Sequence, residues 1–299
     1  MKKQNSFSFL TIGKTSESKE SQEFKRYVGI ASSYVLAVNP DKKTLDDLMG
    51  FESANAPEYV VEGENGKEVR INFIVKTDPE ANNGIEIVTR ASFIMRNAPD
   101  YNRDQTKVRI IDTYGNTSWM NTEDAKQGKK PVSAEGKELK VDSKYRMACV
   151  GEADLVSFLK TYLGVQDVFN YVDGSWVKKP NDEDYKFGLD NIKEYFNGNF
   201  TELKEALKLQ PNNKVKLLYG VRTDDKGNQY QTVCTRDGFV LRNNAGVKAY
   251  DKIEERMKAL KALGSYPTTE FKVQELTEWK AEATNLETPS VSSGDMPWD

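Results

Sequence analysis

Apolar and polar residues alternate in several short segments, and this alternation is the feature that most constrains the fold. In the segment 69–76, apolar residues occupy all four odd positions, whereas Arg70, Asn72 and Lys76 occupy three of the even positions. Neighbouring side chains of a strand point to opposite faces of a sheet, so the pattern predicts strands with one buried and one solvated face. Antiparallel sheets tolerate this arrangement, because one of their faces can remain in water.

Seven segments have this strand character. The first is long for a single flat strand, and Gly29 offers it a place to bulge or bend, which predicts a curled sheet. Turn sequences at 78–84 and 224–228 predict hairpins between the strands that flank them. The predicted strands are Phe24–Val38, Val69–Lys76, Ile85–Arg96, Lys107–Tyr114, Thr117–Met120, Lys214–Arg222 and Gln229–Arg236.

Helical periodicity is strongest at Glu152–Leu163, where six apolar residues share one face and Gly164 follows as a stop. Further helices are predicted at Thr44–Met49, Asp182–Phe196, Thr201–Leu209 and Tyr250–Leu263. The order of strands, then a helical block, then strands predicts an α+β, β-rich fold. We expect an antiparallel Greek-key barrel of five strands with a helical insertion at about residues 151–210.

The predicted organisation has three parts. Residues 1–22 form a flexible N-terminal arm, residues 23–264 form the barrel core with its insertion, and residues 265–299 form an acidic region that ends in a disordered tail. The acidic region holds seven acidic residues against two lysines, a net charge of −5. Because the whole chain carries −3, residues 1–264 carry +2. An acidic arm on such a body can compete with phosphates at low salt, or simply aid solubility.

Composition excludes several classes of protein. The chain has no histidine, and its two cysteines are Cys149 and Cys234, so histidine-based acid–base catalysis and the usual Cys/His zinc sites are excluded. No apolar run approaches eighteen residues and no signal-peptide pattern follows Met1. We therefore expect a cytoplasmic protein with no membrane partner.

An enzyme built on this chain would depend on carboxylates. Several could gather round magnesium, as a nuclease requires: Asp78, Glu80, Asp100, Asp104 and Asp112. Most of them fall in turns, where aspartate is favoured because it hydrogen-bonds the backbone. We therefore expect neither catalytic residues, nor a metal, nor a cofactor.

The solvated face of the predicted strands mixes cations with aromatic rings. Lys and Arg can follow phosphates while rings stack on unpaired bases, so this composition is typical of single-strand binding. A solvated sheet face rich in Lys and Arg is also ordinary in itself. Tyr114 and Trp119, which flank the turn at residues 115–116, could each stack on a base or fill the core. For Trp119 we favour a place in the core. The predicted nucleic-acid-binding residues are Lys25, Tyr27, Arg70, Lys76, Arg90, Arg96, Tyr101, Arg103, Lys107, Arg109, Tyr230 and Arg236.

The last twelve residues combine a flexible polar linker with one apolar anchor. Prolines, serines and a glycine prevent a helix or a central strand, so the anchor is available to a pocket on another protein. The alternative is a frayed chain end without a role. The predicted partner-binding residues are Asp295, Met296, Pro297, Trp298 and Asp299.

Three stretches, Phe24–Asn39, Arg70–Pro79 and Tyr101–Val108, resemble a replication protein of crAss-like Bacteroides phages that is predicted to bind single-stranded DNA. The resemblance covers about residues 24–250. It implies an OB fold and an acidic C-terminal tail, ending in an aromatic or apolar residue, that recruits polymerase, helicase or primase. The C-terminal tail of this chain is similar in general character to such a tail, since it is acidic and carries an aromatic residue near its end. It departs from the pattern because it has few acids and because Asp299 follows the aromatic residue.

From these observations we expect sequence-independent binding of single-stranded DNA in phage replication, in the host cytoplasm, with the tail recruiting replisome partners. The main alternative is a virion structural or assembly protein that uses the barrel as an interaction module. A magnesium-dependent nuclease is the third hypothesis. Binding-site size, oligomeric state and the choice between DNA and RNA stay open.

Overall fold

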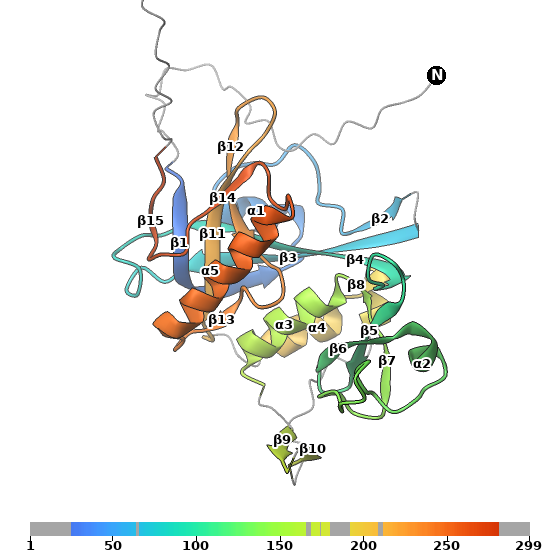
Figure 1. The fold of residues 1–299 in the computed structure, drawn as a ribbon. Coiled ribbons are helices and arrows are strands. Elements are labelled where there is room, and N and C mark those ends of the chain that lie inside the picture. Colours follow the sequence, from blue (N-terminus) through green and yellow to red (C-terminus); the bar gives the residue numbers. More distant parts are fainter. Residues whose placement is uncertain are drawn as a thin grey trace, which may run out of the picture.

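The computed structural model describes residues 25–63, 66–165, 169–173, 175–179, 192–208 and 212–280. Within these ranges the protein is an α+β molecule rich in β-structure, with a curled antiparallel sheet that forms half a barrel (Figure 1). The predicted arm at 1–22 and the predicted partner-binding residues at 295–299 lie outside the described residues. No helix in the described ranges is long and apolar enough to cross a membrane.

Five strands make up most of the curled sheet, and each overlaps a predicted strand. They are β1 (Tyr27–Val38), β3 (Gly66–Thr77), β4 (Val88–Pro99), β11 (Val215–Thr223) and β12 (Gln229–Cys234). The order across the sheet is β12–β11–β1–β3–β4–β8, where β8 is the short strand Cys149–Val150. Four further short strands extend it: β2 (Val60–Gly63) on β3, β13 (Leu241–Arg242) and β14 (Thr269–Phe271) on β11, and β15 (Thr277–Glu278) on β1.

The sheet curls far enough that β12 approaches β4. Thr89 Oγ1 donates a hydrogen bond to Gln231 O at 3.4 Å, and Thr235 Oγ1 donates one to Ser92 O at 3.0 Å. In β1 the pairing with β3 shifts register between Val35 and Ala37, so the bulge lies further along the strand than Gly29. Bulges increase local twist and bend the strand, which favours curling.

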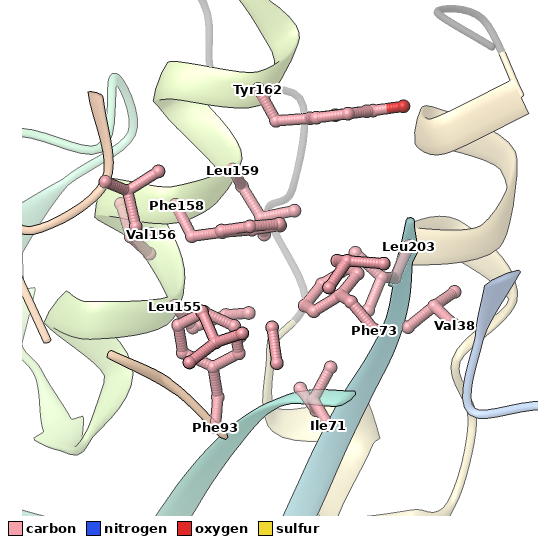
Figure 2. Close-up of a cluster of buried hydrophobic side chains, with 14 of the residues drawn as sticks. Val38, Ile71, Phe73, Phe93, Leu155, Val156, Phe158, Leu159, Tyr162 and Leu203 are labelled. Atoms are coloured by element: carbon pink, nitrogen blue, oxygen red, sulfur yellow. The ribbon is translucent and has the colours of Figure 1, made fainter. Parts of the chain in front are cut away.

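The concave face of the sheet holds the main core. Helix α3 (Glu152–Leu163), the 3₁₀ helix η2 (Ile192–Asn197) and helix α4 (Thr201–Lys208) cover this face. Phe158 of α3 lies with its ring centroid 4.6 Å from that of Phe73 and 5.2 Å from that of Phe93 (Figure 2). The predicted bounds of α3 are confirmed, and Gly164 ends the helix in the left-handed conformation at φ 67°. Of the predicted helix at 182–196, only the part from Ile192 is described.

The outer side is covered in part by two helices. Helix α5 (Val247–Ala262) lies across β11 in Figure 1, and its Ile253 and Met257 pack in one buried cluster with Ile30 and Leu218 of the sheet. Helix α1 (Lys42–Met49) follows β1 and is capped by Asp41, whose side chain accepts a hydrogen bond from Thr44 N.

The segment between β4 and β8 forms a smaller sheet of its own. It contains β5 (Lys107–Asp112), β6 (Thr117–Asn121) and β7 (Tyr145–Met147) in the order β6–β5–β7, with helix α2 (Thr122–Lys126) after β6. The predicted strands Lys107–Tyr114 and Thr117–Met120 therefore lie in a sheet separate from the other predicted strands. Strand β8 pairs with the end of β4 at Arg96 and Pro99, and β5 pairs with β6 and β7 instead. A two-stranded ribbon, β9 (Phe169–Val172) and β10 (Ser175–Lys178), follows α3.

Candidate nucleic-acid interface

Strands β3 and β4 carry a solvated surface at the end nearest β8. Inward side chains such as Ile71 and Phe93 are buried, and the intervening residues face outward in cross-strand pairs. Asn39 orders this end, because its side chain accepts from Asn72 N at 2.7 Å and donates to Arg70 O at 3.1 Å. We call the outward residues Glu68, Arg70, Asn72, Ser92, Ile94 and Arg96 the β3–β4 surface.

Two arginines of the β3–β4 surface share one carboxylate. Arg70 Nη2 lies 3.2 Å from Glu68 Oε1, and Arg96 Nε lies 3.3 Å from Glu68 Oε2. Ion pairs this exposed add at most about 1 kcal/mol each to stability. The β3–β4 surface thus holds two cationic side chains and one acidic side chain, and Ile94 beside them is 49% exposed. A phosphate can bind the guanidinium groups in place of the carboxylate while an apolar ring packs on Ile94.

Other predicted cations of these strands are covered or paired. Arg90 is half-buried near Tyr59 and Asp46, and burial lowers the pKa of its guanidinium. Burial also raises the pKa of Tyr59 to about 12. Lys76 Nζ pairs with Glu86 Oε1 at 2.8 Å. The segment that follows β1 thus covers the middle of the face on which these residues were expected to act together.

Lys25, Tyr27 and Tyr230 lie away from the β3–β4 surface. Lys25 Nζ pairs with Glu278 Oε2 at 2.9 Å, and Tyr27 packs half-buried against the main core. Tyr230 donates its hydroxyl hydrogen bond to Asp224 at 3.0 Å. Strand β1 pairs with β3 only from Ser33 onwards, so the start of β1 does not adjoin Arg70 or Arg96.

Arg109 lies at the contact between the small sheet and the segment after β12. Its guanidinium carbon is 4.6 Å from the ring centroid of Trp119, which is a cation–π arrangement. Its Nε lies 3.1 Å from Asp100 Oδ2 and its Nη1 lies 3.8 Å from Asp237 Oδ2. Burial raises the pKa of Asp100 despite this neighbouring cation. Arg109 therefore links the small sheet to the segment after β12. Its position on a predicted strand gave no indication of this structural role.

The neighbouring Arg236 is exposed, with its guanidinium carbon 6.0 Å from the ring centroid of Tyr266. The next residue, Asp237, donates its backbone N–H to Asp154 Oδ1 at 2.8 Å. Burial raises the pKa of the Asp154 carboxyl. Sequence reasoning missed Asp154, because an acid in the first turn of a helix is an ordinary feature.

Tyr101, in the loop between β4 and β5, was among the predicted nucleic-acid-binding residues. The ring of Tyr101 instead packs half-buried against the core of the small sheet, which includes Val108. Arg103 and Lys107 remain exposed on this loop. Tyr114 is buried and belongs to a small aromatic cluster. The loop thus offers cations to solvent rather than an exposed ring.

The carboxylates considered for a metal site have separate partners. Asp78 Oδ2 pairs with Lys214 Nζ at 2.7 Å, and Asp112 accepts backbone N–H groups from Tyr114 and Asn116. Asp104 accepts from Thr106, and Asp100 meets Arg109 as described. Across the described residues, no group of three or more acidic or cysteine side chains is placed to hold a metal ion.

Sequence reasoning also missed Glu68 and Ile94. The predicted strand began one residue after Glu68, so its place beside Arg70 and Arg96 was not considered. The signal was available, since Glu68 and Arg70 are two residues apart and share a face of any strand.

Comparison with known proteins adds no relative: no family model, no curated protein and no solved structure matches this chain significantly.

Proposed function

We propose that the protein binds single-stranded DNA without sequence preference and that the strand crosses the β3–β4 surface. The observation that carries this proposal is the pair Arg70 and Arg96, which face outward on neighbouring strands, flank the exposed Ile94 and share Glu68. Cations that follow phosphates next to an apolar contact for a base are what such binding requires.

The strand order supports an OB-like reading of the half-barrel. The neighbours β11–β1–β3–β4 have the spatial order of a Greek key, in which the fourth strand lies beside the first. Strand β12 follows as the fifth and is joined to β4 by the two threonine hydrogen bonds, and α3 lies between the third and fourth strands. OB folds bind oligonucleotides on the face of their second and third strands, which here are β3 and β4.

Binding would replace one electrostatic contact with another. A phosphate that approaches Arg70 and Arg96 competes with the Glu68 carboxylate, whose side chain is 19% exposed. The displaced carboxylate opposes binding, so affinity comes from several phosphates and from stacking rather than from one strong contact. The exposed Arg103 and Lys107 of the neighbouring loop provide two further cations.

In replication, a protein of this kind coats exposed template and removes hairpins by mass action on the single-stranded form. We place it in phage DNA replication on the strength of the sequence resemblance. The recruitment of a polymerase, helicase or primase belongs to residues 295–299, which lie outside the described part of the chain.

The test is a titration of fluorescent polythymidine at about 50 and about 200 mM salt. We expect tight, salt-sensitive binding by the wild type. Replacing both Arg70 and Arg96 with alanine should weaken binding about ten-fold at low salt and reduce the salt slope by roughly 1.4, because two phosphate contacts are lost. Arg242→Ala, which removes an exposed arginine on β13, is the control and should change neither quantity. Failure of the wild type to bind at low salt would end the proposal.

A further inference from the structure

The β9–β10 ribbon projects from the molecule away from the curled sheet (Figure 1). Tyr171 and Trp176 lie directly opposite each other in its register, with ring centroids 4.9 Å apart at an angle of 58°. Tyr171 is 63% exposed. A large ring this exposed on a strand requires an explanation, because tyrosine usually buries most of its surface.

The ribbon is held to the small sheet by several contacts. Phe169 and Trp176 pack with the buried Tyr114. Lys178 Nζ lies 2.5 Å from Asp142 Oδ2 and 3.2 Å from the Tyr114 hydroxyl. The Glu138 carboxylate lies close to the backbone of Trp176. The exposed ring therefore stands on a fixed support, which lowers the entropy cost of using it as a contact.

The two faces of the ribbon differ. The face of Tyr171 and Trp176 is aromatic, and Lys140 Nζ lies 5.0 Å from the ring centroid of Trp176. The opposite face carries Val172 and Val177, which are about half exposed.

Lysines outnumber acids around the aromatic face among the described residues. Glu138 pairs with Lys130 and Asp142 with Lys178, and the third acid, Asp173, lies in the turn at the tip of the ribbon. Lys140 adds a positive charge beside the rings, and Lys179 follows directly after β10. An exposed ring among lysines matches the chemistry of an unpaired base joined to phosphates.

We propose that the β9–β10 ribbon is a second platform for single-stranded nucleic acid, on which an unpaired base stacks against Tyr171. This inference rests on the proposed function and extends it: the strand contacts the β3–β4 surface first and reaches the ribbon only when it is long enough.

The test measures affinity for oligothymidines from about 6 to about 30 nucleotides, since one OB fold covers about 4–16 nucleotides. Tyr171→Ala should leave the shortest strands unaffected and weaken the longest about ten-fold, the scale of one lost stacking contact. Tyr171→Phe keeps the ring and should restore wild-type affinity. Val177→Ala, on the opposite face of the same ribbon, is the matched control and should bind as the wild type does.

The outcomes separate the two proposals. If the wild type binds and Tyr171→Ala equals it at every length, the ribbon inference is overturned and the proposed function stands. If the wild type binds no strand at low salt, both are overturned. Equal weakening by Val177→Ala would also overturn the inference, because the ribbon would then have a structural role. The same holds if Tyr171→Ala changes the oligomeric state on size-exclusion chromatography but not the DNA affinity, because the ribbon would then contact another copy of the chain.

Discussion

At the scale of single residues, Glu68 decides how available the two arginines of the β3–β4 surface are. It lies within 3.3 Å of both side chains, so a phosphate must compete with it. An acid at this position lowers the affinity for DNA, so removal of its charge should raise that affinity.

We predict that Glu68→Gln strengthens binding to polythymidine about five-fold at low salt, which corresponds to about 1 kcal/mol for one exposed charge interaction. The gain should shrink at high salt, because screening weakens both the original pair and the new contact. Fluorescence anisotropy at two salt concentrations measures it. Glu254→Gln on α5, which breaks an exposed pair with Lys258, is the control and should have no effect. Weaker binding by Glu68→Gln would contradict this role.

At Asp154, burial disfavours the charged form of the carboxyl group. Burial raises the pKa of its carboxyl in the folded state, so the folded protein holds this proton more tightly than the unfolded chain does. Stability contributed by this group is therefore present at acid pH and is lost as pH rises through the folded pKa. Asp154→Asn should raise the melting temperature at pH 7 and change it little near pH 3. Thermal unfolding at both values tests this, and a loss of stability at pH 7 would show that the carboxylate is needed as an ion.

At the scale of elements, helix α3 closes the concave side of the sheet. The ring of Phe158 on α3 packs against Phe73 of β3 and Phe93 of β4 (Figure 2). The periodic sequence of α3 predicted the helix with its bounds, because an amphipathic pattern and a C-terminal glycine are local signals. Very short strands such as β8 and β13 have no such pattern and depend on a partner strand from elsewhere in the chain.

We predict that Phe158→Ala lowers the free energy of unfolding by about 3–5 kcal/mol, through lost burial and the cavity it leaves. Urea denaturation measures the change. Leu263→Ala, at a position 82% exposed just after α5, should change it by less than about 0.5 kcal/mol. A loss below about 1 kcal/mol for Phe158→Ala would mean that α3 is not part of the main core.

At the scale of the whole molecule, the C-terminal segment of the described chain returns to the first strand. Gly29 allows this approach, since a Cβ atom at this position would lie 2.5 Å from the Glu275 carbonyl oxygen. Its φ of 132° is also a conformation that other residues rarely adopt. The contact joins positions almost 250 residues apart in the sequence.

We predict that Gly29→Ala lowers the free energy of unfolding by about 2–3 kcal/mol, through both backbone strain and the clash with residue 275. Gly227→Ala is the control, because its φ is 81° but no atom lies within 4 Å of the added Cβ. It should cost about 1 kcal/mol, the strain alone. Equal losses in the two variants would show that the close approach at Gly29 can relax.

The sequence by itself determined the local features of this protein: which segments form long strands, where α3 begins and ends, and that the fold is α+β. These follow from period and turn chemistry, which act over a few residues. The tertiary structure alone decided that β5 and β6 leave the main sheet, that Arg90 is covered, that Tyr101 faces a core and that Glu68 meets two arginines. The reason is physical: parity shows which face of a strand a side chain occupies, but what covers that face is set by packing between residues far apart in the chain.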